Sequence, residues 1–279
     1  QARFLLNSIT PHFGVLGGTY SVHRITCYGF EKMTAQQKIP EEQFLKQVQI
    51  VHDLEKVFMD ALRKTQNLIS GTGWGYDDIR ISAFGKLSGI LNSAVVSTYF
   101  LQNHLTHRSW WESTFKSNFK IFEQSVPQTI SCFDGQAKTA LLLGVTSNAE
   151  SVFRVIVKTI DPKACGGGNA AFASIYDWLL RKTGQLSDKP IYDLLRHFRN
   201  TKLHSDGVFQ SHNGKNAQVV YKNESYNFVV NEPCKDFTWK LLTNLAQDNL
   251  DSMLAIVKSS NIAAHPKILD PQKKEDKNL

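Results

Sequence analysis

Apolar side chains recur every three or four positions through most of the second half of the chain, which is the spacing of helices that bury one face. Four such stretches follow one another, at residues 135–159, 170–182, 188–207 and 235–259. Amphipathic helices in this order bury their apolar faces best against one another. The pattern therefore predicts an up-down four-helix bundle.

Residues that cap or stop helices mark the ends of these stretches. Asn169 and Asp188 are of the type that caps a helix start, and Pro190 suits a first turn. Gly184 and Gly207 suit helix ends.

The segment between the last two helices has a different pattern. Residues 217–230, AQVVYKNESYNFVV, alternate between apolar and polar side chains. This alternation predicts a small β-hairpin, with its turn at Asn223-Glu224-Ser225.

The first half of the chain is also predicted to be mainly helical. A helix begins near Pro40 and runs to about residue 69, and a second spans about residues 79–105 after a glycine-rich turn. The first forty residues are mixed, with a short β-like run at residues 19–30.

The fold class expected from these patterns is mainly α, in three regions. Residues 1–130 form a mostly helical N-terminal region without an indicated function, and residues 131–260 form the helical bundle. Residues 261–279 form a polar C-terminal tail. We expect its final run, PKILDPQKKEDKNL, to be solvated because it is rich in charged side chains.

Composition favours a globular protein of the cytoplasm. Hydrophobic residues make up 42% of the chain, enough for a well-buried core, and the net charge of +7 is compatible with a nucleic-acid partner. There is no signal peptide, and the longest apolar run, residues 90–101, is too short and too polar to span a bilayer. We therefore expect a cytoplasmic protein with no membrane partner.

The cysteine spacing gives no indication of a metal site. Cys27, Cys132, Cys165 and Cys234 are far apart, and no pair has the CxxC spacing of structural zinc sites. We expect reduced thiols, no metal and no cofactor.

One short run carries residues suited to chemistry. Arg199, Asn200 and His204 lie within IYDLLRHFRNTKLHSDG, and the last two are four residues apart, so they share a helix face. A histidine can move a proton near neutral pH, and an arginine can hold the charge of a phosphate. Metal-free cleavage of a phosphodiester requires such groups.

With this motif on the third of four helices, residues 134–260 resemble the HEPN superfamily of helical bundles, whose pattern is Arg-polar-x3–5-His. The run NAESVFRVIVKTIDP, residues 148–162, is similar to the long early helix of such domains. The resemblance covers slightly under half of the chain. It implies a metal-independent endoribonuclease of the kind found in toxin–antitoxin, abortive-infection and CRISPR antiviral defence systems.

The resemblance also implies roles for the three motif residues. His204 would act as general base or acid, Arg199 would stabilise charge on the phosphorane, and Asn200 would orient the histidine or the phosphate. Attack of a ribose 2′-OH on the adjacent phosphate would leave a 2′,3′-cyclic phosphate and a 5′-OH.

The implied partners are RNA, a second copy of the chain and an antitoxin or regulatory protein. HEPN domains usually dimerise, so that two motifs face each other in a cleft. Arg196, His197 and Lys202 form a basic neighbourhood that would bind flanking phosphates of the RNA.

Two other interpretations stay open. Arg196, Arg199 and Lys202 also fit the solvated face of an amphipathic helix, with His204 near its C-terminus, where a cation is favoured. A non-catalytic HEPN-like module that binds a nucleotide or a partner protein fits the same residues.

Four further features have simpler interpretations than function. The glycines of residues 71–75 lack the strand–turn–helix frame of a dinucleotide site, and those of residues 166–168 lack the P-loop lysine, so we expect turns. Trp110 and Trp111 could stack bases, but they fit a packing corner better. Glu150 lies among apolar residues and is expected to make a structural hydrogen bond rather than to act as an acid.

Overall fold

The computed structural model describes residues 41–118, 125–204, 207–211 and 213–273. Over these residues the chain is mainly helical, and a two-stranded antiparallel sheet lies between the last two long helices. This confirms the expected mainly α class and the expected hairpin, while the up-down four-helix bundle stays a prediction. The β-like run at residues 19–30 lies outside the described residues.

Two long helices begin the described part of the chain. α1 (Glu41–Thr72) and α2 (Ile79–Phe100) pack along each other and are joined by a turn at Gly73, whose φ of 70° is in the left-handed region that favours glycine. Asp78 caps α2, since its Oδ1 accepts the backbone N–H of Arg80 at 2.9 Å. The sequence predicted both helices at nearly these positions.

The long helix α5 (Val126–Ile160) contacts the elements on both sides of it, namely α2, α7, α8 and α9. Its buried positions recur at helical spacing, as at Leu141, Val145 and Val152. By length and composition alone α5 would pass for a membrane-spanning helix, but just over half of its apolar stretch is buried, as in a core helix. It therefore links α2 to α7, α8 and α9.

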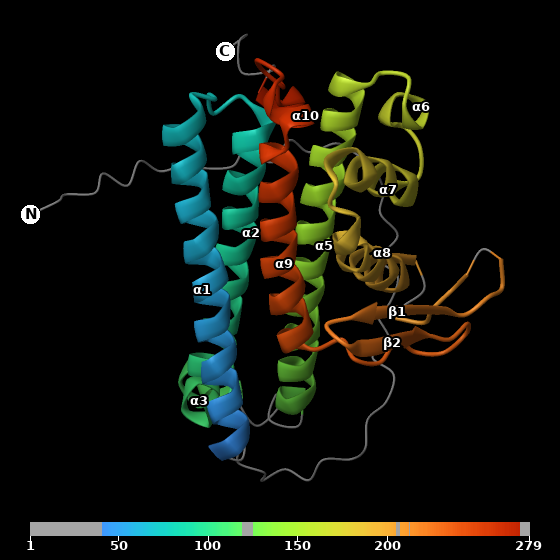
Figure 1. Cartoon of the computed structure of the whole chain (residues 1–279). Helices are drawn as coiled ribbons and strands as arrows, with labels where there is room; N and C mark the ends of the chain where they lie inside the picture. Colours follow the sequence, from blue (N-terminus) through green and yellow to red (C-terminus); the bar gives the residue numbers. More distant parts are fainter. Residues whose placement is uncertain (1–40, 119–124, 205–206, 212, 274–279) are drawn as a thin grey trace, which may run out of the picture. The chain divides into compact units, whose positions relative to one another are not determined.

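The remaining helices are α7 (Phe172–Thr183), α8 (Lys189–His204), α9 (Trp239–Lys258) and the short α10 (Ser260–Ala263). α7, α8 and α9 each contact α5 and one another. α1, α2, α5 and α9 lie side by side in Figure 1, with contacts between α1 and α9 as well as between α2 and α5. The C-terminal helices α5 and α9 thus pack directly against the N-terminal pair, α2 and α1.

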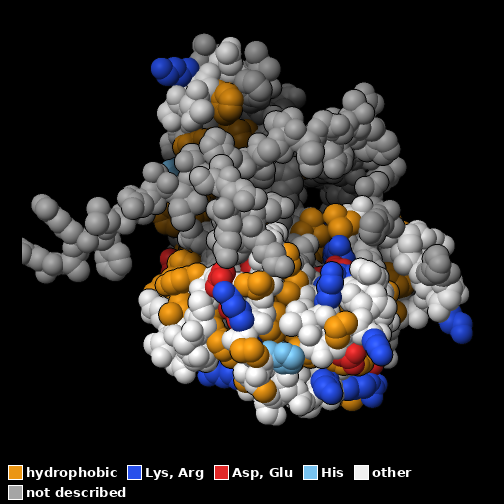
Figure 2. Space-filling view, turned by 90° about the horizontal axis from the view of Figure 1, so that it is seen from above, with side chains coloured by type: hydrophobic (Ala, Val, Ile, Leu, Met, Phe, Trp, Pro, Cys, Tyr) orange, Lys and Arg blue, Asp and Glu red, His pale blue; other side chains and the backbone are white. Residues whose placement is uncertain are grey.

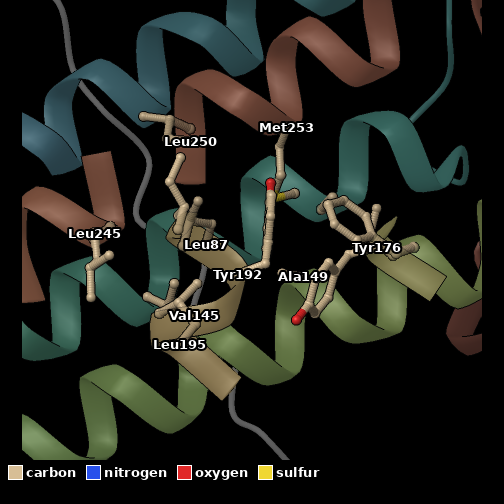
Figure 3. Packing of buried hydrophobic residues seen from close by; sticks show 14 of the residues in the cluster. Leu87, Val145, Ala149, Tyr176, Tyr192, Leu195, Leu245, Leu250 and Met253 are labelled. Atoms are coloured by element: carbon tan, nitrogen blue, oxygen red, sulfur yellow. The ribbon is translucent and has the colours of Figure 1, made fainter. Parts of the chain in front are cut away.

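The hydrophobic core is continuous from α1 to α9. Figure 3 shows side chains of α2, α5, α7, α8 and α9 meeting in one packed cluster, among them Leu87, Val145, Tyr176, Tyr192 and Leu250. The core therefore crosses the boundary expected near residue 131, and the division into regions there stays a prediction.

The hairpin has a tighter turn than expected. β1 (Ala217–Tyr221) pairs with β2 (Glu224–Phe228), which leaves Lys222 and Asn223 as a two-residue turn. Their φ values of 50° and 64° are those of a type I′ turn, which suits the twist of a hairpin. The turn therefore lies at residues 222–223 and begins one position earlier than the expected turn at residues 223–225.

The segment after α10 folds back over the start of α2. Ile268 and Asp270 are buried there. Ser82 Oγ and Lys86 Nζ donate hydrogen bonds to Asp270 Oδ2, at 2.6 and 2.7 Å. The expectation that the run from residue 266 is solvated is wrong for this part, because these residues have partners on α2.

Arg80 holds this segment in place from inside the protein. Its guanidinium is fully buried and lies 2.6 Å from Asp78 Oδ2, and Nη1 donates to the carbonyls of Ile262 and His265 at 3.1 and 2.8 Å. Its plane lies over the Trp74 ring, 3.7 Å from the centroid. One buried cation thus ties the turn before α2 to the segment after α9.

We predict that Arg80→Met lowers the free energy of unfolding by about 3–5 kcal/mol, because Asp78 is then a buried charge without its partner. Urea unfolding followed by circular dichroism measures this. The matched control is Lys267→Met, which removes an exposed ion pair with Asp77, at 2.5 Å, and should cost less than about 1 kcal/mol. Equal losses in the two variants would contradict the role assigned to Arg80.

Candidate functional site

The motif lies on the last turns of α8. The helix ends at His204, and the N–H of Gly207, at a φ of 90°, donates to the carbonyl of Thr201 at 3.1 Å. Asn200 is exposed, and Arg199 is partly buried. The side chain of His204 lies outside the described residues, so only its place at the helix end is known.

Arg199 is paired with Glu150 of α5. Its Nη1 donates to Glu150 Oε2 at 2.8 Å, and the two side chains are 26% and 16% exposed. Arg199 Nε is buried without a hydrogen-bond partner. The expectation that Glu150 makes a structural hydrogen bond is confirmed, and its partner is the motif arginine itself.

A second arginine holds Glu150 from the other side. Arg154 donates to Glu150 Oε1 from Nε at 3.1 Å and from Nη2 at 2.5 Å. Its Nη1 donates to the carbonyls of Gly168 and Ala170, at 2.6 and 2.8 Å. Every donor nitrogen of Arg154 is therefore used within the protein, whereas Arg199 retains donors without a partner among the described residues.

Arg154 thus reaches the carbonyl of Ala170 and that of Gly168, the last residue of an unusual left-handed turn, α6 (Cys165–Gly168). Its four residues have φ values of 49°, 60°, 66° and 84°. A Cβ on Gly168 would lie 3.1 Å from the carbonyl oxygen of Arg154, so glycine permits this close approach to α5. The expectation of a turn is confirmed, while Asn169 ends α6 rather than capping α7.

Arg196 and His197 have their polar atoms in an internal network. Arg196 Nε donates to the Tyr176 hydroxyl at 3.2 Å, and Tyr176 donates in turn to Asp193. Arg196 Nη2 lies 2.9 Å from His197 Nε2, which must accept because a guanidinium has no lone pair to offer. His197 also stacks on Phe228 of the hairpin, at 4.8 Å between ring centroids.

This surrounding keeps His197 neutral. Burial, and then the charge of Arg196, lower the pKa of His197 to about 4. At neutral pH the ring is therefore an acceptor for Arg196 and a packing surface for Phe228. The structure places Arg196 and His197 in contacts within the protein, and among the described residues no hydrogen bond joins either of them to Asn200.

Lys202 lies apart from this network. Its ammonium is half-buried above the Phe237 ring, 4.6 Å from the centroid. Burial, and then the nearby charge of Lys138, lower the pKa of Lys202. Among the described residues it has no hydrogen-bond acceptor.

The tryptophans form a packing corner, as expected. Trp111, on α3 (Arg108–Phe115), is buried and donates from Nε1 to the carbonyl of Leu105 at 2.8 Å. Trp110 meets the Phe100 ring edge-to-face, at 5.6 Å between centroids. This leaves neither ring free as a platform for stacked bases.

The described part of the chain holds no group of three or more His, Cys, Asp or Glu side chains placed to bind a metal. Cys165 and Cys234 are free thiols, and Cys27 lies outside the described residues.

On the face shown in Figure 2, Lys and Arg side chains stand singly or in small groups among apolar and uncharged atoms. This face therefore carries no continuous basic surface over its described residues.

Sequence reasoning missed Arg154, Tyr176 and Lys138 as neighbours of the motif. The spacing of Glu150 and Arg154, four apart on one helix, was the one signal that could have drawn attention to an ion pair there. The contacts of Tyr176 and Lys138 with α8 cross between elements, and no local pattern indicates them.

The chain matches no protein family, no curated protein and no solved structure.

We predict a pH-dependent stability that originates at His197. Its pKa is lower in the folded protein than its ordinary 6.5, so the unfolded chain takes up a proton first as the pH falls. Stability is then full above about pH 6.5 and lost progressively down to about pH 4, by roughly 2 kcal/mol once the partial exposure of the ring is discounted. Unfolding of wild type and His197→Phe is compared across this range, and parallel curves would exclude the effect.

We also predict that Glu150 and Arg199 are energetically coupled. A double-mutant cycle with Glu150→Gln and Arg199→Met should give a coupling of about 1–2 kcal/mol in urea unfolding, because both side chains are largely buried. The exposed pair of Arg181 and Asp177 is the control cycle and should give a clearly smaller coupling. Equal couplings would mean that the Arg199 pair is an ordinary surface contact.

Proposed function

We propose that the chain is a metal-independent endoribonuclease of the HEPN kind, with Arg199, Asn200 and His204 as its catalytic residues. In this proposal α5, α7, α8 and α9 are the four helices of a HEPN-like up-down bundle, and the hairpin is an insertion before the fourth. Their mutual contacts and their order along the chain support this.

One observation carries the proposal. Arg199 is held by Glu150 at 2.8 Å and its side chain remains 26% exposed, and it lies beside the exposed Asn200 on a helix that ends at His204. A guanidinium fixed on one side by a carboxylate loses little freedom when it binds a phosphate on the other. Arg196, by contrast, is committed to Tyr176 and His197.

The proposed reaction needs only a proton acceptor, a proton donor and charge stabilisation. A ribose 2′-OH attacks the adjacent phosphorus while a histidine removes its proton, and the bond to the 5′-oxygen of the next nucleotide breaks as that oxygen is protonated. Arg199 stabilises the negative charge on the phosphorane, and Asn200 orients the phosphate. The products are a 2′,3′-cyclic phosphate and a 5′-OH.

Two histidines are needed if one is to accept and the other to donate the proton. We propose that the second is His204 of another copy, in a cytoplasmic homodimer. A toxin or phage-defence role, with an antitoxin or regulatory partner, fits an RNA-cleaving enzyme that has to be restrained.

We predict that the purified protein cleaves single-stranded RNA in EDTA and that His204→Ala lowers the rate at least about 100-fold, because proton transfer is lost. Asn200→Ala, at an exposed position, should lower the rate without a change in stability. The matched control is His52→Ala, at an exposed histidine of α1. Direct labelling of the fragments by polynucleotide kinase checks for the 5′-OH, and cleavage that survives in His204→Ala would overturn the proposal.

A second candidate function rests on the same ion pair. Because Glu150 already neutralises Arg199 in part, the motif also fits a non-catalytic HEPN-like module that binds a nucleotide or a partner protein. Absence of cleavage together with saturable nucleotide binding, lost in Arg199→Met, would favour this alternative.

A further inference from the structure

Two lysines lie over two rings of the segment that leads into α9. Lys202 of α8 lies over Phe237 at 4.6 Å, and Lys138 of α5 lies over Trp239 at 5.9 Å. The two ammonium groups thus come from helices far apart in the sequence and meet at one edge of the protein. They are close enough for the charge of Lys138 to act on Lys202.

The Lys202 ammonium is left without a direct counter-ion at this place. Asp236 is near enough to act on Cys234, but no hydrogen bond or ion pair joins it to Lys202 among the described residues. Asp134 accepts from Lys138 Nζ at 2.5 Å and from Trp239 Nε1 at 2.7 Å, so its carboxylate is already used. Cys234 also faces Lys202, but burial raises the pKa of its thiol to about 11, so it supplies no negative charge at neutral pH. Lys202 is left as a half-buried cation without an acceptor among the described residues.

An anion that binds from the solvent would stabilise a cation in this position. Burying an ammonium without a hydrogen-bond acceptor is unfavourable, and the ring of Phe237 compensates only in part.

We propose that Lys202 and Lys138 form a subsite for a phosphate of the RNA that flanks the cleaved one. The inference rests on the proposed function for the identity of the ligand, and on the Lys202 ammonium without a direct counter-ion for its place. Lys202 is three residues beyond Arg199 on the same helix, so the two side chains are neighbours on one face and the subsite adjoins the motif arginine. Its residues bind substrate and take no part in the proton transfers.

The experiment compares Lys202→Met and Lys138→Met with the control Lys240→Met. Lys240 is an exposed lysine of α9, and its substitution removes the same charge nearby. Binding of a short single-stranded RNA is measured by fluorescence anisotropy between 50 and 200 mM salt, roughly the range over which phosphate contacts dominate. We expect Lys202→Met to weaken binding about 3–10-fold and to reduce the salt slope by about 0.7, the value for one lost phosphate contact on a single strand. Lys240→Met should leave the slope unchanged, and Lys202→Arg should restore it.

A second measurement separates this inference from the proposed enzyme activity. Inorganic phosphate is titrated against wild type and Lys202→Met, with protein stability as the readout. Stabilisation of wild type alone supports the subsite, even if no RNA is cleaved. If Lys202→Met matches wild type in both phosphate and RNA binding, the subsite is excluded, even if RNA is cleaved. Circular dichroism of Lys138→Met checks that loss of its Asp134 pair leaves the fold intact.

Discussion

A charge that is taken out of water has to keep its partners, and this constraint governs the fold at two places. Arg80 is fully buried and finds Asp78 on one side and carbonyls of the C-terminal segment on the other. Glu150 is largely buried and finds Arg154 and Arg199. Apolar packing brings the helices together but tolerates small rotations and slides, whereas these hydrogen bonds permit only one arrangement. The position of the C-terminal segment on α2 and the position of α8 both depend on these hydrogen bonds.

The helices were predictable because their signal is local. The spacing of apolar residues and the capping residues lie within each element, so α8 and α9 were expected close to their observed positions, whereas α5 begins at Val126, nine residues before its expected start at residue 135. The C-terminal run was not predictable in this way. Taken as a whole, this run is polar and charged, and nothing in the sequence distinguishes Asp270 from a solvated carboxylate. Its partners Ser82 and Lys86 are more than 180 residues away, and only the folded chain brings them to it.

The same distinction between local signals and contacts across elements applies to the candidate site. In the sequence, Arg196, Arg199 and Lys202 are equivalent cations on one helix. In the structure each has a different partner on another element: Tyr176 for the first, Glu150 for the second and the Phe237 ring for the third. The sequence could therefore locate the motif helix and name its polar residues, but it could not say which of them are already used. That distinction decides which cations can still meet a ligand.

The pairing of Arg199 with Glu150 also bears on how a moderately basic chain could bind a polyanion. With Arg154 held fully by the protein, the cluster of two arginines and one glutamate carries a net charge of about +1, enough for one phosphate. A continuous basic surface would bind RNA tightly along its length and release it slowly. Separate single-phosphate positions, at Arg199 and at the two lysines, would instead fix the register of a strand with little excess affinity. Such an arrangement would use its few cations to place one phosphodiester at the helix end, as a cleavage site at His204 would require.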